Sequence, residues 1–351
     1  MSSFRLENIV RKNIRDLVPY SSARSEFEGK AKVFLDANEN SLGSVAQENF
    51  SRYPDPLQKD LKQKISEIKH IRTEHIFVGN GSDEAIDLLI RAFCNPSIDN
   101  ILICPPTYGM YQVCADINDV AVKKVLLTPA FGLDIEAIKK DTDEHTKLIF
   151  ICSPNNPTGN LMCSSHITSL LEDFSGIVVI DEAYIDFADV ASWSSQLDAH
   201  PNLVVLQTLS KAWGLAALRI GLAFASTEII GILNRIKPPY NISGIAQQLS
   251  LDALSREVEK NQKVEILKKE RAKLQNLFSE FRFIEKIYSS DANFLLLKTT
   301  DAARLYDYLV ANDIVVRNRS SQPLCENCLR VTVGTPGENE LLAQVLKNYS
   351  L

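Results

Sequence analysis

Lys211 is the residue of this sequence whose type and neighbours best suit covalent chemistry. It follows Thr208 and Ser210 at the end of the apolar run 202–208, and Arg219 comes soon after it. Most lysines are solvated surface charges. Here the adjacent hydroxyls and the guanidinium favour another interpretation, in which a reactive amine lies beside an anionic group such as a phosphate.

Like Lys211, a carboxylate and an amide lie at or just after the ends of two other apolar runs. Asp181 ends the apolar run 177–181, where an unpaired acid is costly. Its ordinary role would be an N-cap or an ion pair, and its functional role would be to hold a proton on a heterocyclic nitrogen. Asn156 lies in the turn-forming segment 153–159, from which its amide can face the same sheet edge.

The segment Gly79–Glu84 has the composition of a tight turn between a strand and a helix. Its glycines allow the turn, and the first amides of the helix predicted over 82–93 can then bind a phosphate. The segment does not match the dinucleotide-binding fingerprint, because Glu84 stands where that motif has its third glycine.

These residues fall at the ends of short apolar runs that alternate with helical patterns from residue 75 onward. The later runs are continuous and β-branched, as in parallel strands covered on both faces. This alternation predicts a doubly wound α/β sheet, and such sheets bind ligands at the carboxyl ends of their strands. An amine, a carboxylate, an amide and a phosphate cradle at one edge together suit pyridoxal phosphate.

The character of the chain changes near residue 240. A long, charged, helix-prone stretch over 247–281 is followed by short predicted strands and a helix over 301–312, which indicates an α+β module. We therefore predict three parts: an N-terminal arm over 1–32, a large domain over 33–240 and a small domain over 241–351.

Composition narrows the class of protein. The 351 residues are 45% apolar and 23% charged, the balance of a globular chain, and the net charge of −6 argues against a general nucleic-acid binder. The N-terminal residues lack the apolar core of a signal peptide, and no run approaches the ~18 apolar residues of a membrane span. We therefore predict a cytoplasmic protein with neither a membrane nor a nucleic acid as partner.

The cysteines offer one close pair, Cys325 and Cys328. A structural zinc site would need four ligands, and no histidine lies at a matching spacing. We therefore interpret the pair as part of a plain loop and predict no metal.

Taken in order, the motifs resemble those of the class I and II aminotransferases with the aspartate aminotransferase fold, and within them the histidinol-phosphate aminotransferases. The matching segments are Leu17–Tyr20, Asp36–Asn40, Arg52–Pro54, Gly79–Glu84, Pro106–Tyr111, Asn156–Gly159, Asp181–Tyr184, Ser210–Lys211 with Arg219, and Leu329–Gly334. The resemblance implies the type I fold of pyridoxal-phosphate-dependent transferases, with a mainly parallel, doubly wound sheet in a large domain, a smaller α+β domain and an N-terminal arm. Ser41 departs from the family, which often has proline there.

The resemblance also assigns roles to single residues. It implies that Lys211 binds pyridoxal 5'-phosphate covalently and that Asp181 pairs with the ring nitrogen. Asn156 and Tyr184 match the groups that hold the phenolic oxygen, and Tyr108 matches the aromatic side chain that stacks on the ring. Lys211, Asp181 and Tyr184 are then the catalytic residues.

The family's phosphate cradle comes from several segments. Its positions are occupied here by Ser82, Asp83, Thr208, Ser210 and Arg219. Tyr53 matches a tyrosine that reaches the cofactor phosphate of the neighbouring subunit. The resemblance therefore implies a homodimer, although Tyr53 taken alone would be interpreted as an ordinary core or surface tyrosine.

Two arginines bear on substrate choice. Arg330 stands where this fold holds the substrate carboxylate, and Arg317 matches a second arginine used for a substrate phosphate. Two guanidinium groups suit a dianion. Arg319 could compete with Arg317 for this role. Tyr20 resembles an arm residue that closes over the same phosphate, and Asn156 also faces the substrate.

The resemblance implies transamination between L-histidinol phosphate and 2-oxoglutarate, which gives imidazole acetol phosphate and L-glutamate in histidine biosynthesis. Three alternatives remain open: an aromatic amino-acid aminotransferase, a lyase similar to threonine-phosphate decarboxylase, and a non-enzymatic regulatory module. The regulatory module normally carries a DNA-binding segment, for which this acidic chain has no spare residues.

Overall fold

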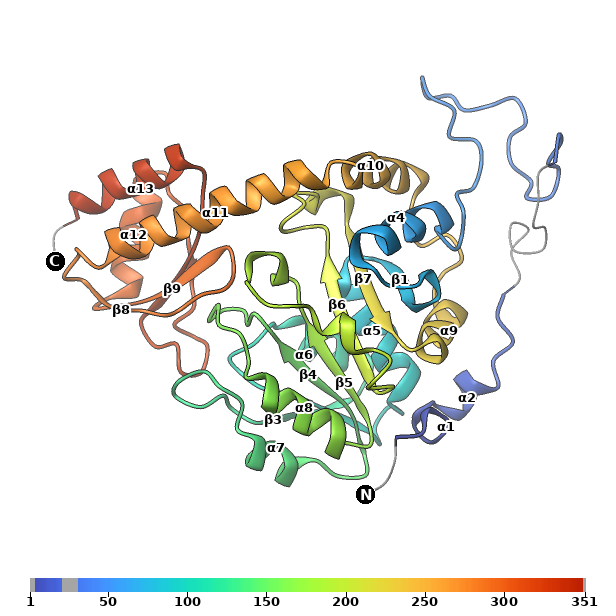
Figure 1. The fold of residues 1–351 in the computed structure, drawn as a ribbon, viewed down its shortest axis with the longest axis horizontal. Helices are drawn as coiled ribbons and strands as arrows, with labels where there is room; N and C mark the ends of the chain where they lie inside the picture. Colours follow the sequence, from blue (N-terminus) through green and yellow to red (C-terminus); the bar gives the residue numbers. More distant parts are fainter. Residues whose placement is uncertain (1–3, 21–30, 350–351) are drawn as a thin grey trace.

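The computed structural model describes residues 4–20 and 31–349, so the predicted arm falls partly outside it, at 1–3 and 21–30. The described residues form a large unit around a seven-stranded sheet and a small unit around a four-stranded sheet (Figure 1). Helix α11 (Glu257–Phe278) runs along the molecule from the large unit to the small one.

The large sheet has the strand order β1-β7-β6-β5-β4-β2-β3. Parallel pairing joins β3, β2, β4, β5 and β6 in turn, whereas β7 is antiparallel to both of its neighbours, β1 and β6. This sheet confirms the predicted mainly parallel, doubly wound architecture. Its strands are β1 (Ile76–Asn80), β2 (Asn100–Ile103), β3 (Ala121–Lys124), β4 (Thr146–Cys152), β5 (Ile177–Asp181), β6 (Leu203–Thr208) and β7 (Ile220–Ala225).

Helices cover both faces of this sheet. Along β5, Ile177 and Val179 join one apolar cluster while Val178 and Ile180 join another on the opposite face. The first cluster includes side chains of α5, α6 and α9, and the second includes side chains of α4, α7, α8 and α10. The helices are α4 (Lys59–Lys69), α5 (Ser82–Phe93), α6 (Met110–Ile117), α7 (Ile135–Asp141), α8 (Ser164–Asp173), α9 (Thr227–Ile236) and α10 (Gly244–Leu254). Burial on both faces explains the continuous apolar runs in the sequence.

Short 3-10 helices connect several of these elements. They are η1 (Thr73–His75), η2 (Ile185–Phe187), η3 (Trp193–Gln196) and η4 (Ala216–Leu218).

The small unit is an antiparallel sheet with the strand order β10-β11-β9-β8. Its elements are β8 (Ile284–Ile287), β9 (Phe294–Thr299), α12 (Ala302–Ala311), β10 (Arg317–Asn318), β11 (Cys328–Thr332) and α13 (Pro336–Lys347). Apolar residues of the sheet, of α12 and α13 and of the end of α11 form a separate core. Strand β10 is shorter than the predicted run over 313–319, in which Val315 is exposed.

The helix-prone stretch over 247–281 forms two helices rather than one. Arg256 has φ −106° and ψ 40°, which is not helical, and it separates α10 from α11. Leu254 at the end of α10 belongs to the core of the large unit, whereas Leu274 and Phe278 of α11 belong to the core of the small unit. The break lets the two helices face different cores. The domain boundary near residue 240 stays a prediction.

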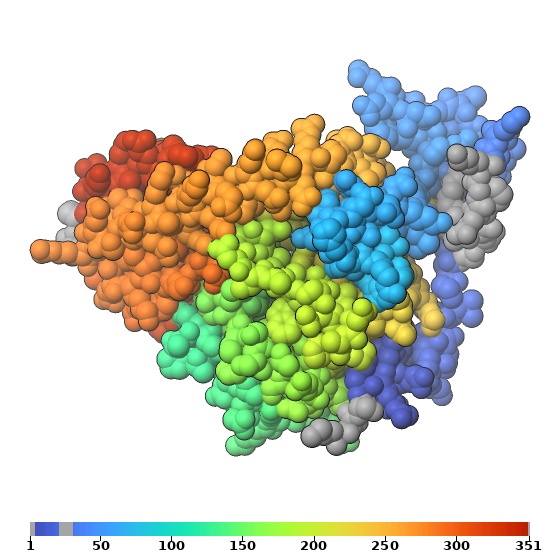
Figure 2. Space-filling model, in the orientation of Figure 1, coloured from blue at the N-terminus to red at the C-terminus, as the bar shows by residue number. Residues whose placement is uncertain are grey.

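The described part of the arm has two regions. Helices α1 (Leu6–Ile9) and α2 (Lys12–Arg15) lie against the large unit, where Arg235 of α9 donates a hydrogen bond to the Arg15 carbonyl, 3.0 Å. Residues 31–57 protrude from the body of the molecule (Figures 1 and 2). Within the described ranges, no helix is long and apolar enough to cross a membrane.

Candidate active site

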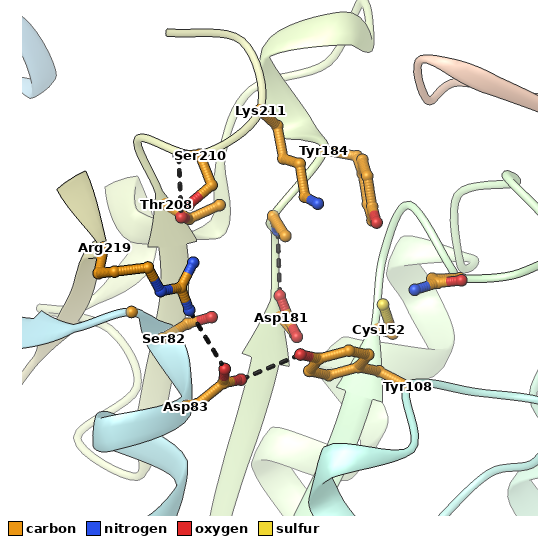
Figure 3. Close-up of a pocket in the computed structure, with 13 residues that line it drawn as sticks. Ser82, Asp83, Tyr108, Cys152, Asp181, Tyr184, Thr208, Ser210, Lys211 and Arg219 are labelled. Atoms are coloured by element: carbon orange, nitrogen blue, oxygen red, sulfur yellow. Dashed lines mark hydrogen bonds and ion pairs between the residues drawn. The ribbon is translucent and has the colours of Figure 1, made fainter. Parts of the chain in front are cut away.

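A cleft opens at the carboxyl ends of three adjacent strands of the large sheet. Cys152, Asp181 and Thr208 are the last residues of β4, β5 and β6, and all three line the cleft (Figure 3). The space within it, including the part open to solvent, is about 500 Å³. Its lining residues are Gly81, Ser82, Asp83, Tyr108, Cys152, Asn156, Asp181, Ala183, Tyr184, Thr208, Ser210, Lys211 and Arg219. Every residue predicted to hold the cofactor from within its own chain is among them.

Asp181 lies at the bottom of this cleft and is almost fully buried, with 2% of its surface exposed. Its Oδ2 accepts a hydrogen bond from the Tyr111 hydroxyl at 2.7 Å, and its Oδ1 accepts one from the Ala183 amide at 3.0 Å. Burial nevertheless raises the pKa of this carboxyl. The site would therefore be stabilised by a cationic partner that restores the ionised carboxylate.

Lys211 lies just beyond the end of β6, and its amine points toward Asp181 and Tyr184 in Figure 3. Its Nζ is 5.6 Å from the centroid of the Tyr184 ring. Although the residue is exposed through the mouth of the cleft, burial of the amine and the positive charge of Arg330 lower its pKa. A larger fraction of the amine is therefore neutral and nucleophilic than in a solvated lysine.

The turn between β1 and α5 forms a cradle with Arg219 on one side. Gly81 precedes the first residue of α5 and has φ +74°; a Cβ atom there would lie 2.7 Å from Nη2 of Arg219. The Gly81 amide donates to the Arg219 carbonyl at 2.6 Å. Ser82 then presents its hydroxyl and backbone amide at the positive end of α5, an arrangement suited to a phosphate.

Asp83 contributes to this cradle differently from its neighbour. Its carboxylate forms an ion pair with Arg219 at 3.6 Å and accepts a hydrogen bond from the Tyr108 hydroxyl at 3.1 Å. A carboxylate repels phosphate, so its side chain orients Arg219 and Tyr108 rather than binding the anion directly. Burial, followed by the charge of Asp83, raises the pKa of Tyr108, which keeps its hydroxyl protonated.

The arginines of the small unit approach the cleft from β10 and β11. Arg330 donates from Nη1 to Oδ1 of Asn156 at 2.5 Å, and its guanidinium lies 5.1 Å from the centroid of the Phe294 ring. Arg317 is directly opposite Arg330 in the antiparallel ladder, so their side chains share one face of the small sheet. Arg319 follows the end of β10 and is near enough to both arginines for their charges to affect it.

The guanidinium groups of this face carry uncompensated charge. Burial and the positive charges of Arg330 and Arg317 lower the pKa of Arg319 to about 10. Among the described residues, the buried Nε atoms of Arg319 and Arg330 have no hydrogen-bond partner. Arg317 is exposed. The face is thus arranged to receive an anion.

Two of the predicted residues lie outside the cleft in a single chain. Tyr53 is 51% exposed and stacks on Tyr240, with ring centroids 4.5 Å apart, in a separate hollow. Tyr20 is 79% exposed on the arm. Neither residue lines the cleft that holds Lys211.

Sequence reasoning missed two residues of the site. Tyr111, which donates a hydrogen bond to Asp181, lies in the segment 106–111 that resembles the family, but the sequence alone does not indicate this contact. Cys152 lines the cleft from the end of β4, and its place at the end of an apolar run was the available signal.

The cysteine pair near Arg330 is part of the protein core. Cys325 and Cys328 are free thiols with no exposed surface. Over residues 4–20 and 31–349, no group of three or more His, Cys, Asp or Glu side chains is arranged to hold a metal ion.

The donor set of the cleft fits pyridoxal phosphate. A buried carboxylate with a raised pKa suits a protonated ring nitrogen, and an amine with a lowered pKa suits a bond to an aldehyde. The glycine turn, which a Cβ would fill, leaves room for the phosphate beside Ser82 and Arg219.

Residues 22–346 match the family model for aminotransferase class I and II. A histidinol-phosphate aminotransferase of Cytophaga hutchinsonii is 55% identical over 347 residues, which cover 99% of this chain and 100% of that protein. The crystal structure of the histidinol-phosphate aminotransferase from Clostridium acetobutylicum is similar with a TM-score of 0.79 at 25% identity, over 85% of this chain and 90% of that one. The enzyme from Sinorhizobium meliloti in complex with pyridoxal-5'-phosphate has a TM-score of 0.77 at 20% identity, over 90% of each chain, which shows a common fold.

Proposed function

The chain belongs to the class I and II aminotransferases and, within them, to the histidinol-phosphate aminotransferases; on that premise we propose how its residues act. The reaction is the pyridoxal-phosphate-dependent transfer of the amino group of L-histidinol phosphate to 2-oxoglutarate, a step of histidine biosynthesis. Its products are imidazole acetol phosphate and L-glutamate. The observation that carries this assignment is the 55% identity to such an enzyme over 99% of the chain.

Pyridoxal phosphate supplies, when bound, an aldehyde that condenses with amines and a ring that accepts an electron pair. Lys211 is the amine that anchors it. Asp181 holds the proton on its ring nitrogen, and Tyr111 holds Asp181 in place through the 2.7 Å hydrogen bond. Asn156 and Tyr184 bind its phenolic oxygen, and Tyr108 packs on its ring.

Lys211 also moves the proton of the reaction. Because burial and Arg330 lower its pKa, its freed Nζ is neutral often enough to take a proton from the substrate carbon that bears the amine. The ammonium so formed is close enough to be stabilised by the Tyr184 ring, with 5.6 Å between Nζ and the ring centroid. One side chain thus serves as anchor, base and acid.

The arginines of the small unit bind the substrate's charged groups. Arg330 holds a carboxylate of glutamate or 2-oxoglutarate, and Arg317 joins it for the phosphate of histidinol phosphate, with Tyr20 closing over that phosphate from the arm. Two observations support this proposal. Arg317 and Arg330 lie on the same face of the small sheet, and the buried Nε of Arg330 has no hydrogen-bond partner among the described residues.

The active unit is a homodimer in which Tyr53 contributes to the partner's site. Residues 31–57 protrude from the body (Figure 2) and expose large apolar side chains, with Leu35 82% and Leu42 99% exposed. Such a surface suits burial against a second copy. Tyr53 lies on this segment, outside the cleft of its own chain. The cytoplasmic location and the absence of a nucleic-acid partner stay predictions.

Steady-state kinetics with two amino donors test the substrate. We expect kcat/KM for L-histidinol phosphate to exceed that for phenylalanine by orders of magnitude, because a phenyl group leaves the arginines without a dianion. A preference for phenylalanine would instead make the protein an aromatic aminotransferase. Release of carbon dioxide without any 2-oxoglutarate would make it a lyase. Lys211→Ala should show no turnover and none of the absorbance of a cofactor covalently bound to lysine, while the fold stays intact.

A further inference from the structure

Asn241 uses every hydrogen-bonding site of its side chain to join two distant segments. Its Nδ2 donates to the Val78 carbonyl at 3.0 Å and to Oε2 of Glu84 at 2.9 Å. Its Oδ1 accepts from Nζ of Lys237 at 3.0 Å and from Nε2 of Gln58 at 3.2 Å. A carboxamide has two donors and an acceptor oxygen with two lone pairs, so the side chain is saturated.

The donor side of Asn241 holds the turn that carries Ser82. Val78 belongs to β1, and Glu84 lies in the first turn of α5, so the two bonds cover both ends of the turn. The same Oε2 of Glu84 accepts a hydrogen bond from the Asn80 amide at 2.5 Å. Asn241 and Asn80 therefore fix the Glu84 carboxylate together, and with it the backbone that presents Ser82 to the cleft.

The acceptor side of Asn241 holds the segment that carries Tyr53. Lys237 is buried, and its Nζ also donates to the Pro56 carbonyl at 2.7 Å and to the Pro239 carbonyl at 3.0 Å. Gln58 donates to the Pro56 carbonyl at 2.8 Å. These bonds tie residues 56–58 to the loop after α9.

Ring stacking continues the attachment up to Tyr53 itself. Tyr240, next to Asn241 in the chain, stacks on Tyr53 with 14° between the ring planes. Gln247 of α10 donates to the Asp55 carbonyl at 3.1 Å. The orientation of Tyr53 therefore depends on the same loop as the orientation of Ser82.

We propose that Asn241 is a positioning residue that holds two phosphate contacts in place at once: the Ser82 turn in its own subunit and Tyr53, offered to the partner's site. The inference rests on the proposed function, which makes Ser82 and Tyr53 ligands of the cofactor phosphate. Asn241 does not line the cleft, so it acts only through these two segments. A fixed loop binds the phosphate more tightly because less ordering is needed on binding.

The first test compares pyridoxal phosphate with pyridoxal, which lacks the phosphate, as ligands of full-length Asn241→Ala. We expect the dissociation constant of pyridoxal phosphate to rise about tenfold or more, and that of pyridoxal to stay unchanged. Equal weakening of both ligands would mean that Asn241 only supports the fold, which would overturn the proposal. No weakening of either ligand would overturn it as well.

A matched control separates positioning from loss of stability. Asn202 is buried and donates from Nδ2 to the carbonyls of Leu171 and Phe174 at 3.0 and 3.2 Å, at the end of β6 remote from Thr208. Asn202→Ala should lower the thermal midpoint but leave the ratio of the two dissociation constants at the wild-type value. The isosteric variant Asn241→Asp loses the donors and gains a negative charge beside Glu84; it serves if Asn241→Ala does not fold, and we expect it to change the same ratio.

Double-mutant cycles test whether Asn241 serves both contacts. We expect the effect of Asn241→Ala on the affinity for pyridoxal phosphate to be non-additive with Ser82→Ala and also with Tyr53→Phe. Additivity with either variant would overturn the linkage of the two contacts. If the wild-type protein binds no pyridoxal phosphate, the proposed function itself has failed, which is a different result from any of these.

Discussion

At the scale of single residues, the site concentrates positive charge around one amine. Burial of the amine, followed by the positive charge of Arg330, lowers the pKa of Lys211. Arg319 lies in the same field, with its pKa lowered to about 10. These charges should affect the pH dependence of the Lys211 amine and the stability of the protein, and the two effects can be measured separately.

The pKa of Lys211 sets the pH at which the cofactor-free protein forms its bond to pyridoxal phosphate. Because the lowered pKa makes the neutral amine available below the usual range of lysine, the rate should rise with pH and level off below pH ~10.4. Arg330→Gln removes a repelling charge and should shift this midpoint upward. Stopped-flow absorbance measures this midpoint. Arg282 is exposed and lies outside the cleft, so Arg282→Gln serves as the control. An unmoved midpoint in Arg330→Gln would contradict the assigned cause.

We expect Arg319 to lower the stability of the fold and to strengthen the binding of an anion. Arg319→Met removes a charge that Arg330 and Arg317 repel, so the free energy of unfolding should rise by roughly 1 kcal/mol after solvent screening is considered. The extra stability that inorganic phosphate confers on the wild type should fall in the same variant. Thermal unfolding with and without phosphate measures both effects. A lower midpoint without phosphate would mean that Arg319 is a structural residue, and Arg282→Met should change neither quantity.

At the scale of elements, α4 carries a buried cation on its inner face. Lys62 is 7% exposed, beside Leu61 and Ile65, which are 1% exposed. Burial, and next the charge of Lys237, lower the pKa of Lys62 to about 8. The helix thus gains its packing while leaving one charge poorly solvated.

Replacing this lysine should stabilise the protein. At pH 7 the buried ammonium costs free energy, so Lys62→Met should raise the free energy of unfolding by on the order of 2 kcal/mol. Between pH ~8 and ~10.4 the unfolded state binds more protons than the native state, so wild-type stability rises with pH in that window. In Lys62→Met the free energy of unfolding should increase less with pH. Urea unfolding at several pH values measures both the free energy at pH 7 and this increase. Lys64→Met on the outer side of α4 should leave the slope unchanged, since Lys64 pairs with Glu67 near the surface.

At the scale of the whole molecule, the cleft of one chain brings together ten of the predicted cofactor residues but not Tyr53. Segment 31–57 protrudes from the body of the molecule (Figure 1), and the hollow that it forms with Tyr240 shares no lining residue with the cleft that holds Lys211. A tyrosine that serves the cofactor from this position would have to do so in a second copy.

Mixed dimers test this arrangement. Lys211→Ala and Tyr53→Ala should each be impaired when pure. After subunit exchange, each mixed dimer should contain one site with an intact lysine and an intact tyrosine, restoring roughly a quarter of wild-type activity. If Tyr53 acts within its own subunit, the mixture should show only the average of the two pure variants. Light scattering before and after exchange provides the control that both variants are dimers.

The residues that meet in the cleft could be predicted from the sequence because each lies beside a local signal. Lys211, Asp181 and Ser82 stand at the ends of apolar runs or at the start of a helix, and such ends meet at one edge of a doubly wound sheet. The cluster of ten predicted cofactor residues in one cleft follows from this rule. The order of the motifs then identified the family.

Only the tertiary structure decided which side chains touch across long stretches of chain. Tyr111 bonds to Asp181, and Asn241 joins Glu84 to Gln58, although no periodicity relates these positions. The break at Arg256 likewise depends on two cores that a single stretch of helix-prone sequence does not reveal. Local patterns fix where elements begin and end, whereas contacts between loops depend on how the finished elements pack, and that information is spread over the whole chain.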